Sequence, residues 1–447
     1  MPVTGTPPFV LTSATYYGTL AAARMLGRDG VPVVLADPRL VAHTRWSRYV
    51  TRRVSLPRAA TPDALVERFL ELGAASPGMV LYPTNDDLAW LFAVHAERLS
   101  RHFRLYQPSA DVIYRLLNKK RLFELCREIG FDAPETHFPE DAAGVERLAR
   151  GLPYPVMVKP QTQILLATKV KGVQVEGPEA IVATYRDFIA RNPYDEALVR
   201  HDPGVVKPMI QAFHHAAAEA IYSVAGFASR AGEVELRASV KILQWPRKIG
   251  TGICFGAAPL DPTVGERLAA LCRKVGYHGA FEVEFIRDGD RHLLIDFNPR
   301  FYGQMGFEAA RGLPMANLVH AAACGDDRKV TRLLEASRTG EERHATAFCN
   351  RNLFELALRG QRLLGVMGTG DYRRWRAWER RHRGRREDAV WAKDDPVPGI
   401  VDFLQHQAHA AHHPRGFLRT LLELGREDAP EEDPARLPAS APPKLTA

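Results

Sequence analysis

The chain has 447 residues, which is room for about three structural units. Hydrophobic residues make up 46% of it and charged residues 25%, a balance that excludes a disordered, collagen-like or disulfide-scaffold protein. Most of the net charge of +8 comes from eight arginines between Arg373 and Arg386, so it does not indicate a protein that coats nucleic acid along its whole length.

Residues 1–108 are predicted to alternate between strands and helices. Three apolar runs predict strands and an Ala-rich run predicts a helix, in the order 9–13, 19–28, 31–36 and 79–82. This alternation indicates a parallel sheet with crossover helices. The first turn holds one glycine, Gly18, where a dinucleotide-binding loop has three, and this argues against a nicotinamide site.

Residues 109–325 carry the chemistry. The helical stretch 109–129 changes its apolar face near Asn118, which predicts two helices, with Asn118 as the N-cap of the second and Gly130 as its end. Lys119 would then lie at a helix start, where free backbone N–H groups attract phosphate. A solvent-exposed basic face is the alternative interpretation of Lys119 taken alone.

Two further strands are predicted before the end of this part. Residues 155–160 form a strand that ends in Lys159, and the flanking prolines are expected to hold this charge in a cleft. No glycine follows between positions 161 and 170, and Lys171 comes next. Residues 208–213 form the second strand, whose end is expected to offer its backbone to an adenine ring.

The most specific signal is a β-hairpin predicted over residues 279–298. Apolar and polar residues alternate in both of its strands, and cross-strand partners must share a face. A two-residue turn would pair apolar with polar residues, so the pattern predicts an odd loop at 288–290, with Phe285 opposite Leu293. The polar face then carries Glu282, Glu284, Asp296 and Asn298. Such oxygen ligands suit Mg²⁺ or Mn²⁺, and a solvated polar face is the alternative.

These residues resemble the ATP-grasp superfamily, and within it the carboxylate–amine ligases. The most specific match is Val283-Glu284-Phe285 followed by Ile-Asp-Phe-Asn-Pro-Arg at 295–300. The resemblance covers residues 1–325. It implies an α/β fold in which a Rossmann-like, parallel-sheet pre-ATP-grasp domain (1–108) precedes a split ATP-grasp domain of α+β type (109–325).

The candidate site residues follow from matching positions one by one. The metal ligands would be Glu284, Asp296 and Asn298. The ATP-binding residues would be Lys119, Lys159, Lys171, Gln211, Ala212, Phe213 and Glu219. Among them Gln211, Ala212 and Phe213 would contact adenine, and Glu219 would contact the ribose. The catalytic residues would be Arg300, at the transferred phosphate, and Lys241, which adds positive charge near the phosphates.

The sequence departs from the family pattern in three ways. The loop 161–170 lacks the usual glycines, Asp296 stands where Glu is common, and Gln211 stands where an acid is common. Some members that act on amino acids or peptides also lack the glycine-rich loop, so such a substrate is favoured. Five residues lie at strand ends facing the expected cleft without an assignable role: Tyr16, Tyr17, Asn85, Asp86 and Asp87.

The resemblance implies an enzyme that uses ATP and Mg²⁺ (or Mn²⁺). It would activate a carboxylate, of an amino acid or peptide, as an acyl phosphate for attack by an amine, giving an amide bond, ADP and phosphate. Its partners would be a small-molecule carboxylate and an amine. One alternative is an ATP-grasp carboxylase or kinase. An alternative of another class is a basic protein that binds RNA or a membrane surface through residues 373–386.

Residues 326–426 predict a helical extension, and residues 427–447 a disordered tail. Trp375 and Trp378 are three apart and share a helix face. We expect them to pack on the ATP-grasp core as a cap, and a homo-oligomer with this cap at its interface is left open. Contact with nucleic acid or an anionic membrane is not favoured. The arginines would reach solvent or pair with Glu387, Asp388, Asp394 and Asp395.

The expected location is the cytoplasm. The five cysteines are scattered and form no Cys-x-x-Cys pair, which argues against a disulfide framework or a structural zinc site and fits a reducing compartment. The sequence shows no secretory signal and no apolar run of the ~18 residues that a membrane span needs.

Overall fold

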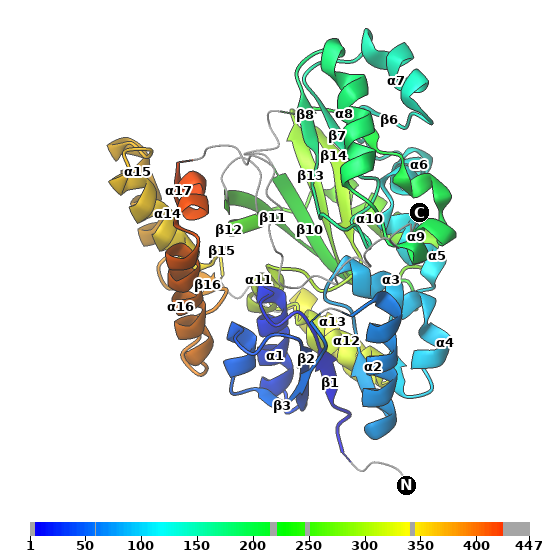
Figure 1. The fold of residues 1–447 in the computed structure, drawn as a ribbon. Coiled ribbons are helices and arrows are strands. Elements are labelled where there is room, and N and C mark those ends of the chain that lie inside the picture. Colours follow the sequence, from blue (N-terminus) through cyan, green and yellow to red (C-terminus); the bar gives the residue numbers. More distant parts are fainter. Residues whose placement is uncertain (1–4, 59, 215–220, 246–250, 340–344, 423–447) are drawn as a thin grey trace, which may run out of the picture.

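In the computed structural model of the chain, five short apolar strands form a parallel sheet in the order β3-β2-β1-β4-β5 (Figure 1). The structure describes residues 5–58, 60–214, 221–245, 251–339 and 345–422. β1, β2 and β4 are buried throughout, as expected where helices cover both faces of a parallel sheet. The elements are β1 (Phe9–Leu11), α1 (Tyr17–Arg28), β2 (Val33–Asp37), η1 (His43–Trp46), β3 (Val50–Ser55), α2 (Pro62–Ala75), β4 (Met79–Leu81), α3 (Asp86–Val94), α4 (Ala96–Leu99) and β5 (Phe103–Leu105).

The parallel sheet confirms the prediction from strand–helix alternation, and the lone glycine of its first turn has a packing role. A Cβ atom on Gly18 would lie 2.1 Å from the carbonyl oxygen of Tyr302. α1 therefore approaches the backbone of the segment after the hairpin at a distance that only glycine allows.

A seven-stranded sheet forms the centre of the molecule and a four-stranded sheet lies beside it (Figure 1). Their orders are β14-β13-β10-β11-β12-β15-β16 and β6-β9-β7-β8. The elements up to the larger sheet are α5 (Ala110–Leu117), α6 (Lys119–Ile129), β6 (Thr136–His137), α7 (Ala142–Ala149), β7 (Val156–Lys159), β8 (Val173–Val175), α8 (Pro178–Arg191), α9 (Glu196–His201), η2 (Pro203–Val206) and β9 (Met209–Ala212). Those that follow are β10 (Ile221–Ala228), β11 (Val234–Trp245), β12 (Thr251–Ala258), α10 (Pro262–Val275), β13 (Gly279–Asp288), β14 (Arg291–Asn298), α11 (Met305–Ala310) and α12 (Met315–Ala323).

The predicted break between two helices is confirmed. The side chain of Asn118 accepts a hydrogen bond from the backbone N–H of Arg121 at 3.2 Å and so caps α6. Gly130 ends α6 in a left-handed conformation with φ of 76°. Lys119 is consequently the first residue of α6, as the polar cap and the glycine predicted.

The predicted register of the hairpin is wrong along its whole length. Asp288 faces Arg291, so the turn has two residues, and Phe285 faces Leu294 instead of Leu293. An irregularity next to Phe285 leaves Ile295 without a direct partner, and beyond it Glu284 faces Asp296. The bulge inserts one extra residue and so restores the alternation that an odd loop would have given. The prediction that the polar residues share one face is therefore confirmed.

The C-terminal extension is not only helical. β15 pairs antiparallel with β12, and β16 pairs parallel with β15, so the extension adds two strands to the central sheet. The helices that follow β15 form a layer at the side of this sheet (Figure 1). The elements are α13 (Asp327–Thr339), β15 (Ala347–Cys349), α14 (Arg351–Leu363), α15 (Thr369–Arg381), β16 (Arg386–Asp388), α16 (Val397–His412) and α17 (Pro414–Leu421).

The tryptophans of the extension pack as expected. Trp375 is 6% exposed and belongs to an apolar cluster with Leu243 and Ile253 of the central sheet and Phe354 of α14. Trp378 is partly buried against the same cluster. The interpretation of this segment as a cap is therefore confirmed for its aromatic residues.

Two of the acids considered as partners for the arginines of residues 373–386, Asp394 and Asp395, pair elsewhere. Asp394 binds Arg28 and Asp395 binds Arg24, both on α1. Arg24 and Arg28 are one helical turn apart, and the face that they share meets the extension. The sequence distance of more than 360 residues is the reason that local charge patterns missed this pairing.

Arg24 fixes the extension to the first domain through a buried set of hydrogen bonds. Its Nε donates to Oδ2 of Asp395 at 2.9 Å, and its Nη2 donates to the carbonyl of Val390 at 2.8 Å. Asp395 also accepts from the hydroxyl of Ser47 and from the backbone N–H of Arg48. Charge-assisted bonds of this kind are roughly twice as strong as neutral ones.

No helix within the described ranges has the length and apolar character to cross a bilayer.

Candidate functional site

Lysines and carboxylates from four elements meet on the polar face of the hairpin. Lys119, at the start of α6, forms an ion pair with Asp296 of β14. The Nζ of Lys241, on β11, lies 2.6 Å from Oε1 of Glu284 on β13. Burial raises the pKa of Asp296 but Lys119 outweighs it, so the pKa is lowered and the carboxylate stays ionised. Burial likewise would lower the pKa of Lys241, and Glu284 raises it overall.

Lys159 reaches the same place from the four-stranded sheet. It ends β7, and its Nζ donates to Oε1 of Gln211 on β9 at 3.1 Å. Burial is the main reason that its pKa falls to about 8, and the positive charges of Lys119 and Lys171 lower it further. Lys171 itself is exposed, between β7 and β8. Lys159 is thus a cation with cationic neighbours and no carboxylate of its own, in a position that favours an anionic ligand.

Arg300 is held by three hydrogen-bond partners, one of which is the backbone carbonyl of Phe301, 2.9 Å from its Nη1. Its Nε donates to Oδ1 of Asp86 at 2.6 Å, and its Nη2 donates to Oδ1 of Asn298 at 2.8 Å. Burial would lower the pKa of Arg300, and Asp86 raises it overall. The sequence placed Asp86 at a strand end without a role, and the structure shows that it orients this guanidinium.

Glu282 shares the polar face but is enclosed by neutral donors. It accepts hydrogen bonds from the Nδ2 of Asn298 at 2.7 Å, from the Nε2 of Gln304 at 3.0 Å, and from the hydroxyl of Ser223. Burial raises its pKa to about 7, with a further rise from Glu284. Sequence reasoning missed Ser223 and Gln304, because neither carries a charge or stands in a recognisable motif.

The segment expected at adenine is bonded within the protein. The backbone N–H of Ala212 donates to the carbonyl of Glu135 at 2.9 Å, and that of Phe213 donates to the carbonyl of Pro155 at 3.2 Å. An adenine ring would have to use other atoms of this segment. Glu219, the expected ribose contact, lies outside the described residues.

The glycine-poor loop 161–170 is anchored to the first domain. Asp87 accepts hydrogen bonds from the Nζ of Lys169 at 2.7 and 2.8 Å and from the backbone N–H of Leu165 at 2.7 Å. Leu165 and Lys169 have φ of 46° and 52°, left-handed conformations that cost a side-chain-bearing residue about 1 kcal/mol each. The hydrogen bonds to Asp87 stabilise this conformation. The acidic strand end was noticed in the sequence, but nothing in it pointed to Lys169.

Replacement of Asp87 by asparagine is expected to lower the free energy of unfolding by about 2 kcal/mol, because the buried end of Lys169 loses its charged acceptor. Urea unfolding measures this loss, and hydrogen exchange should show faster exchange at Leu165. Glu67→Gln is the matched control, since Glu67 also pairs with an arginine but on the surface. Equal stability of the Asp87 variant and the wild type would show that this ion pair does not hold the loop.

The donor types at the hairpin fit Mg²⁺. Glu284 and Asp296 face each other across the strands, and Asn298 follows Asp296 on the same face. Oxygen ligands from carboxylates and amides are those that Mg²⁺ prefers. Over the ranges that the structure describes, no three His, Cys, Asp or Glu side chains gather closely enough to hold a metal ion, so a site here depends on the asparagine and on groups of a ligand.

Comparison with known proteins finds similarity at the level of structure alone. No family model and no curated protein matches the sequence. The biotin carboxylase domain of the Hydrogenobacter thermophilus 2-oxoglutarate carboxylase, solved with MgADP and bicarbonate, superimposes with a TM-score of 0.57 at 16% identity over 72% of this chain and 70% of that chain. The L-amino acid ligase of Bacillus licheniformis gives 0.55 at 17% identity over 72% and 76%.

A third solved structure agrees. N5-carboxyaminoimidazole synthetase of Staphylococcus aureus gives a TM-score of 0.52 at 12% identity, over 72% of this chain and 79% of that chain. This chain has a parallel sheet, a seven-stranded sheet that contains the hairpin, and a four-stranded sheet, and its similarity to these structures is what the hairpin motif predicted. The chain has the ATP-grasp fold.

Proposed function

We propose that the chain is an ATP-dependent, ADP-forming ligase that activates a carboxylate as an acyl phosphate for attack by an amine. The observation that carries the proposal is the arrangement of Lys119, Lys159 and Arg300 around Glu284 and Asp296, on the polar face of one hairpin. This arrangement places fixed positive charge beside candidate ligands for a divalent cation. Cations and Mg²⁺ together are what the joining of two anions requires.

The chemistry explains the need for this charge. A carboxylate does not react with an amine at neutral pH, because oxide is a poor leaving group, whereas the phosphate of an acyl phosphate leaves readily. To form it, the site must bring the carboxylate to the γ-phosphate of ATP against their mutual repulsion. Lys119 and Lys159 would bind phosphate oxygens, and Arg300, which Asp86 orients, would hold the transferred phosphate. No protein nucleophile is needed, since the substrate carboxylate itself attacks.

The proposed metal ligands are Glu284, Asp296 and Asn298. When bound, Mg²⁺ would supply positive charge that balances the negative charge developing on the phosphate during transfer. In the structure Lys241 and Lys119 neutralise the two carboxylates, so both lysines also keep these side chains in place on the hairpin. Gln211 positions Lys159, and the remaining candidates Lys171, Ala212 and Phe213 stay proposals for nucleotide contact.

The nature of the acid is proposed from two neighbours of the fold. One is named an L-amino acid ligase, which supports an amino acid or peptide as the carboxylate, in agreement with the glycine-poor loop. Another is a carboxylase solved with bicarbonate, which favours a second candidate in which bicarbonate is the acid. Both reactions form ADP and phosphate, and they differ in the acid that triggers ADP release.

The test is a screen of ADP release with Mg²⁺ and ATP, with amino acids singly and in pairs, and with bicarbonate in a separate arm. A ligase releases ADP in proportion to an amide product whose mass is the sum of both substrates less one water. Release that needs bicarbonate and no amine would support the carboxylase. ATP that is not consumed under any of these conditions, while ATP binding is also absent, would contradict both.

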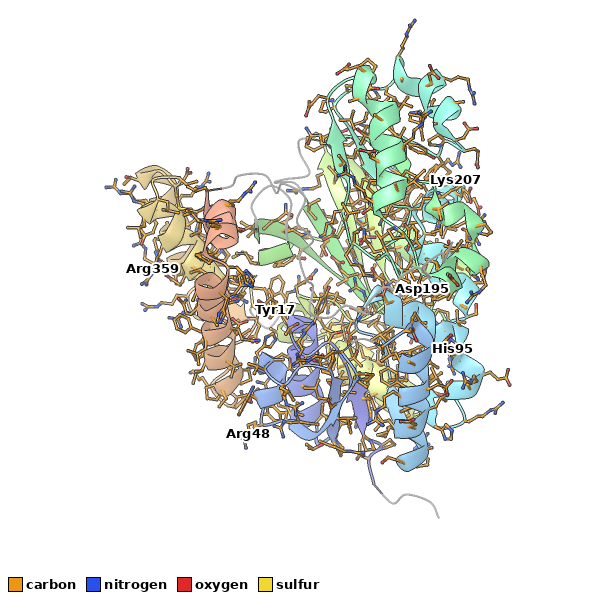
Figure 2. All side chains as sticks on the ribbon, in the orientation of Figure 1. Tyr17, Arg48, His95, Asp195, Lys207 and Arg359 are labelled. Carbon is orange, nitrogen blue, oxygen red and sulfur yellow. The ribbon has the colours of Figure 1, made fainter. Side chains whose placement is uncertain are left out.

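Lys159→Ala is expected to weaken the binding of a non-hydrolysable ATP analogue by about 10- to 100-fold, the loss of one charge-assisted hydrogen bond. Stability without nucleotide should not fall. The folded pKa of about 8 is below the ordinary 10.5, so the protonated lysine costs stability below pH 8, and this cost fades as the pH rises. Lys207→Ala, a lysine on the outer surface in Figure 2, is the control.

The same pKa predicts a pH dependence of binding. Phosphate favours the protonated lysine, so affinity should fall as the pH rises above 8, by up to about tenfold per pH unit. Lys159→Arg, which stays protonated, should remove this dependence while it keeps affinity. Calorimetry between pH 7 and 9.5 measures both. A large loss of stability in Lys159→Ala with unchanged affinity would mean that the residue is structural.

A further inference from the structure

A cavity of about 370 Å³ lies between α1, α11 and β16, where the first domain meets the C-terminal extension. None of the residues assigned to ATP or metal lines it. Tyr17, at the start of α1 and on its side toward the extension, marks the place in Figure 2. α11 separates the cavity from the hairpin, since Gly306 and Ala309 line the cavity while Gln304, just before the helix, contacts Glu282.

The charges of the lining are mostly satisfied. Three of them have partners of opposite sign: Arg24 pairs with Asp395, Arg28 with Asp394, and Asp29 with Lys329. The carboxylate of Asp388 accepts two backbone N–H groups, those of Val390 and Trp391. These groups therefore form the frame of the cavity and do not need a ligand.

Two hydrogen-bond acceptors of the lining have no partner in the described part of the chain. Among the residues that the structure describes, Glu387 has neither a hydrogen-bond nor a salt-bridge partner, although it lines the cavity and is partly buried. Burial raises the pKa of Glu387 to about 7, against the lowering effect of Arg28, which lies nearby without bonding to it. Asn317, 8% exposed, has a buried Oδ1 without a hydrogen-bond partner. Buried acceptors are normally satisfied, so the Oδ1 of Asn317, together with the carboxylate of Glu387 that is unpaired within the described ranges and belongs to the same lining, indicates a ligand that donates hydrogen bonds.

The net negative charge around the cavity favours a cationic ligand, and its apolar walls favour a ligand with an apolar chain. Counting the lining and its partners, Arg24, Arg28 and Lys329 contribute three positive charges against five negative ones from Asp29, Glu387, Asp388, Asp394 and Asp395, a net charge of −2 when all are ionised. The rest of the wall consists of small or apolar side chains: Ala21, Met25, Ala309, Ala310, Pro314 and Phe348. An ammonium group has three donors and no acceptor, which complements this site.

We propose that this cavity binds a small organic ammonium ion, a primary amine on a short apolar chain, with its nitrogen at Glu387 and Asn317. The volume is at the lower end of ligand pockets and suits a molecule of this size. The site is separate from the proposed nucleotide site and does not depend on the proposed reaction.

The probe is butylamine, with 1-butanol and butyrate as neutral and anionic analogues at constant ionic strength. Butylamine should bind saturably, with a Kd on the order of 1 mM for so small a ligand, and raise the melting temperature, while the analogues do neither. Glu387→Gln should weaken binding at least tenfold. Ala309→Leu, which fills the cavity without a change of charge, should abolish it. Glu71→Gln, at an exposed pair on α2, is the control.

Three results would overturn the proposal. Equal effects of butylamine and 1-butanol would show that only the apolar walls act. Unchanged binding in Glu387→Gln, with the variant folded as judged by its melting temperature, would remove the charged anchor. Stabilisation by Mg²⁺ instead of butylamine, lost in Glu387→Gln, would show that the cavity holds a metal ion.

Discussion

Asp296→Asn should lower the rate of ADP formation by about two to three orders of magnitude and leave the fold intact. Loss of one fixed stabilising charge or donor at a reacting phosphate costs about this much. The carboxylate faces Glu284 across the hairpin and pairs with Lys119, so its removal weakens the proposed metal site and leaves the lysine without a counter-charge. Asparagine has the same shape and can still accept a hydrogen bond from Lys119, which preserves the local packing.

The measurement is steady-state ADP release together with the melting temperature. Asp288→Asn is the control, because Asp288 lies on the same hairpin but pairs with Arg291 at the exposed turn. The control should keep full activity. If the Asp296 variant turned over ATP at the wild-type rate, the assignment of Asp296 as a metal ligand would be wrong. This result would not by itself contradict the proposed ligase reaction.

A chain cut after Gly325 should be insoluble or inactive. The cut removes β15 and β16, so the edge of β12 is opened to solvent. It also removes Trp375 from its cluster with the central sheet and Asp395 from Arg24. Loss of one partner of a buried ion pair alone costs about 3–5 kcal/mol, a large part of the stability of a domain.

The matched control is a chain that ends at Leu422, which keeps every described element and should stay soluble and active. Expression yield, gel filtration and ADP release distinguish the two truncations. If the shorter chain were soluble and fully active, and the intact one sedimented with anionic liposomes or RNA at low salt, the extension would be a targeting element and not a cap.

Local signals in the sequence predicted a large part of the fold. The cap at Asn118 and the stop at Gly130 depend on neighbours within one helical turn, and the structure confirms both. Alternation in the hairpin placed its polar residues on one face, because side chains in a strand alternate whatever the turn. The motif on that face was enough to predict the ATP-grasp fold.

The rest depends on contacts between distant segments. A two-residue turn with a bulge at Ile295 and an odd loop without a bulge both keep the apolar residues of the hairpin on one face. The alternation of apolar and polar residues cannot distinguish these two arrangements. The strand at β15 is three residues long and exists because β12 offers an edge. The ion pair of Asp87 with Lys169 joins α3 to the loop 161–170. On charge alone, any of the 60 lysines and arginines would be an equally good partner for Asp87.

The packing of α1 has a consequence for biosynthesis. This helix is made well before the residues near 302, 317, 348 and 395 that cover its faces. Contacts at such sequence separation are slow to form, because a long loop must close before any of them stabilises the chain. Until then the alanine-rich side of α1 is exposed to other chains. We therefore expect the N-terminal sheet to need protection during translation, and nascent chains stalled before residue 395 to be protease-sensitive within α1.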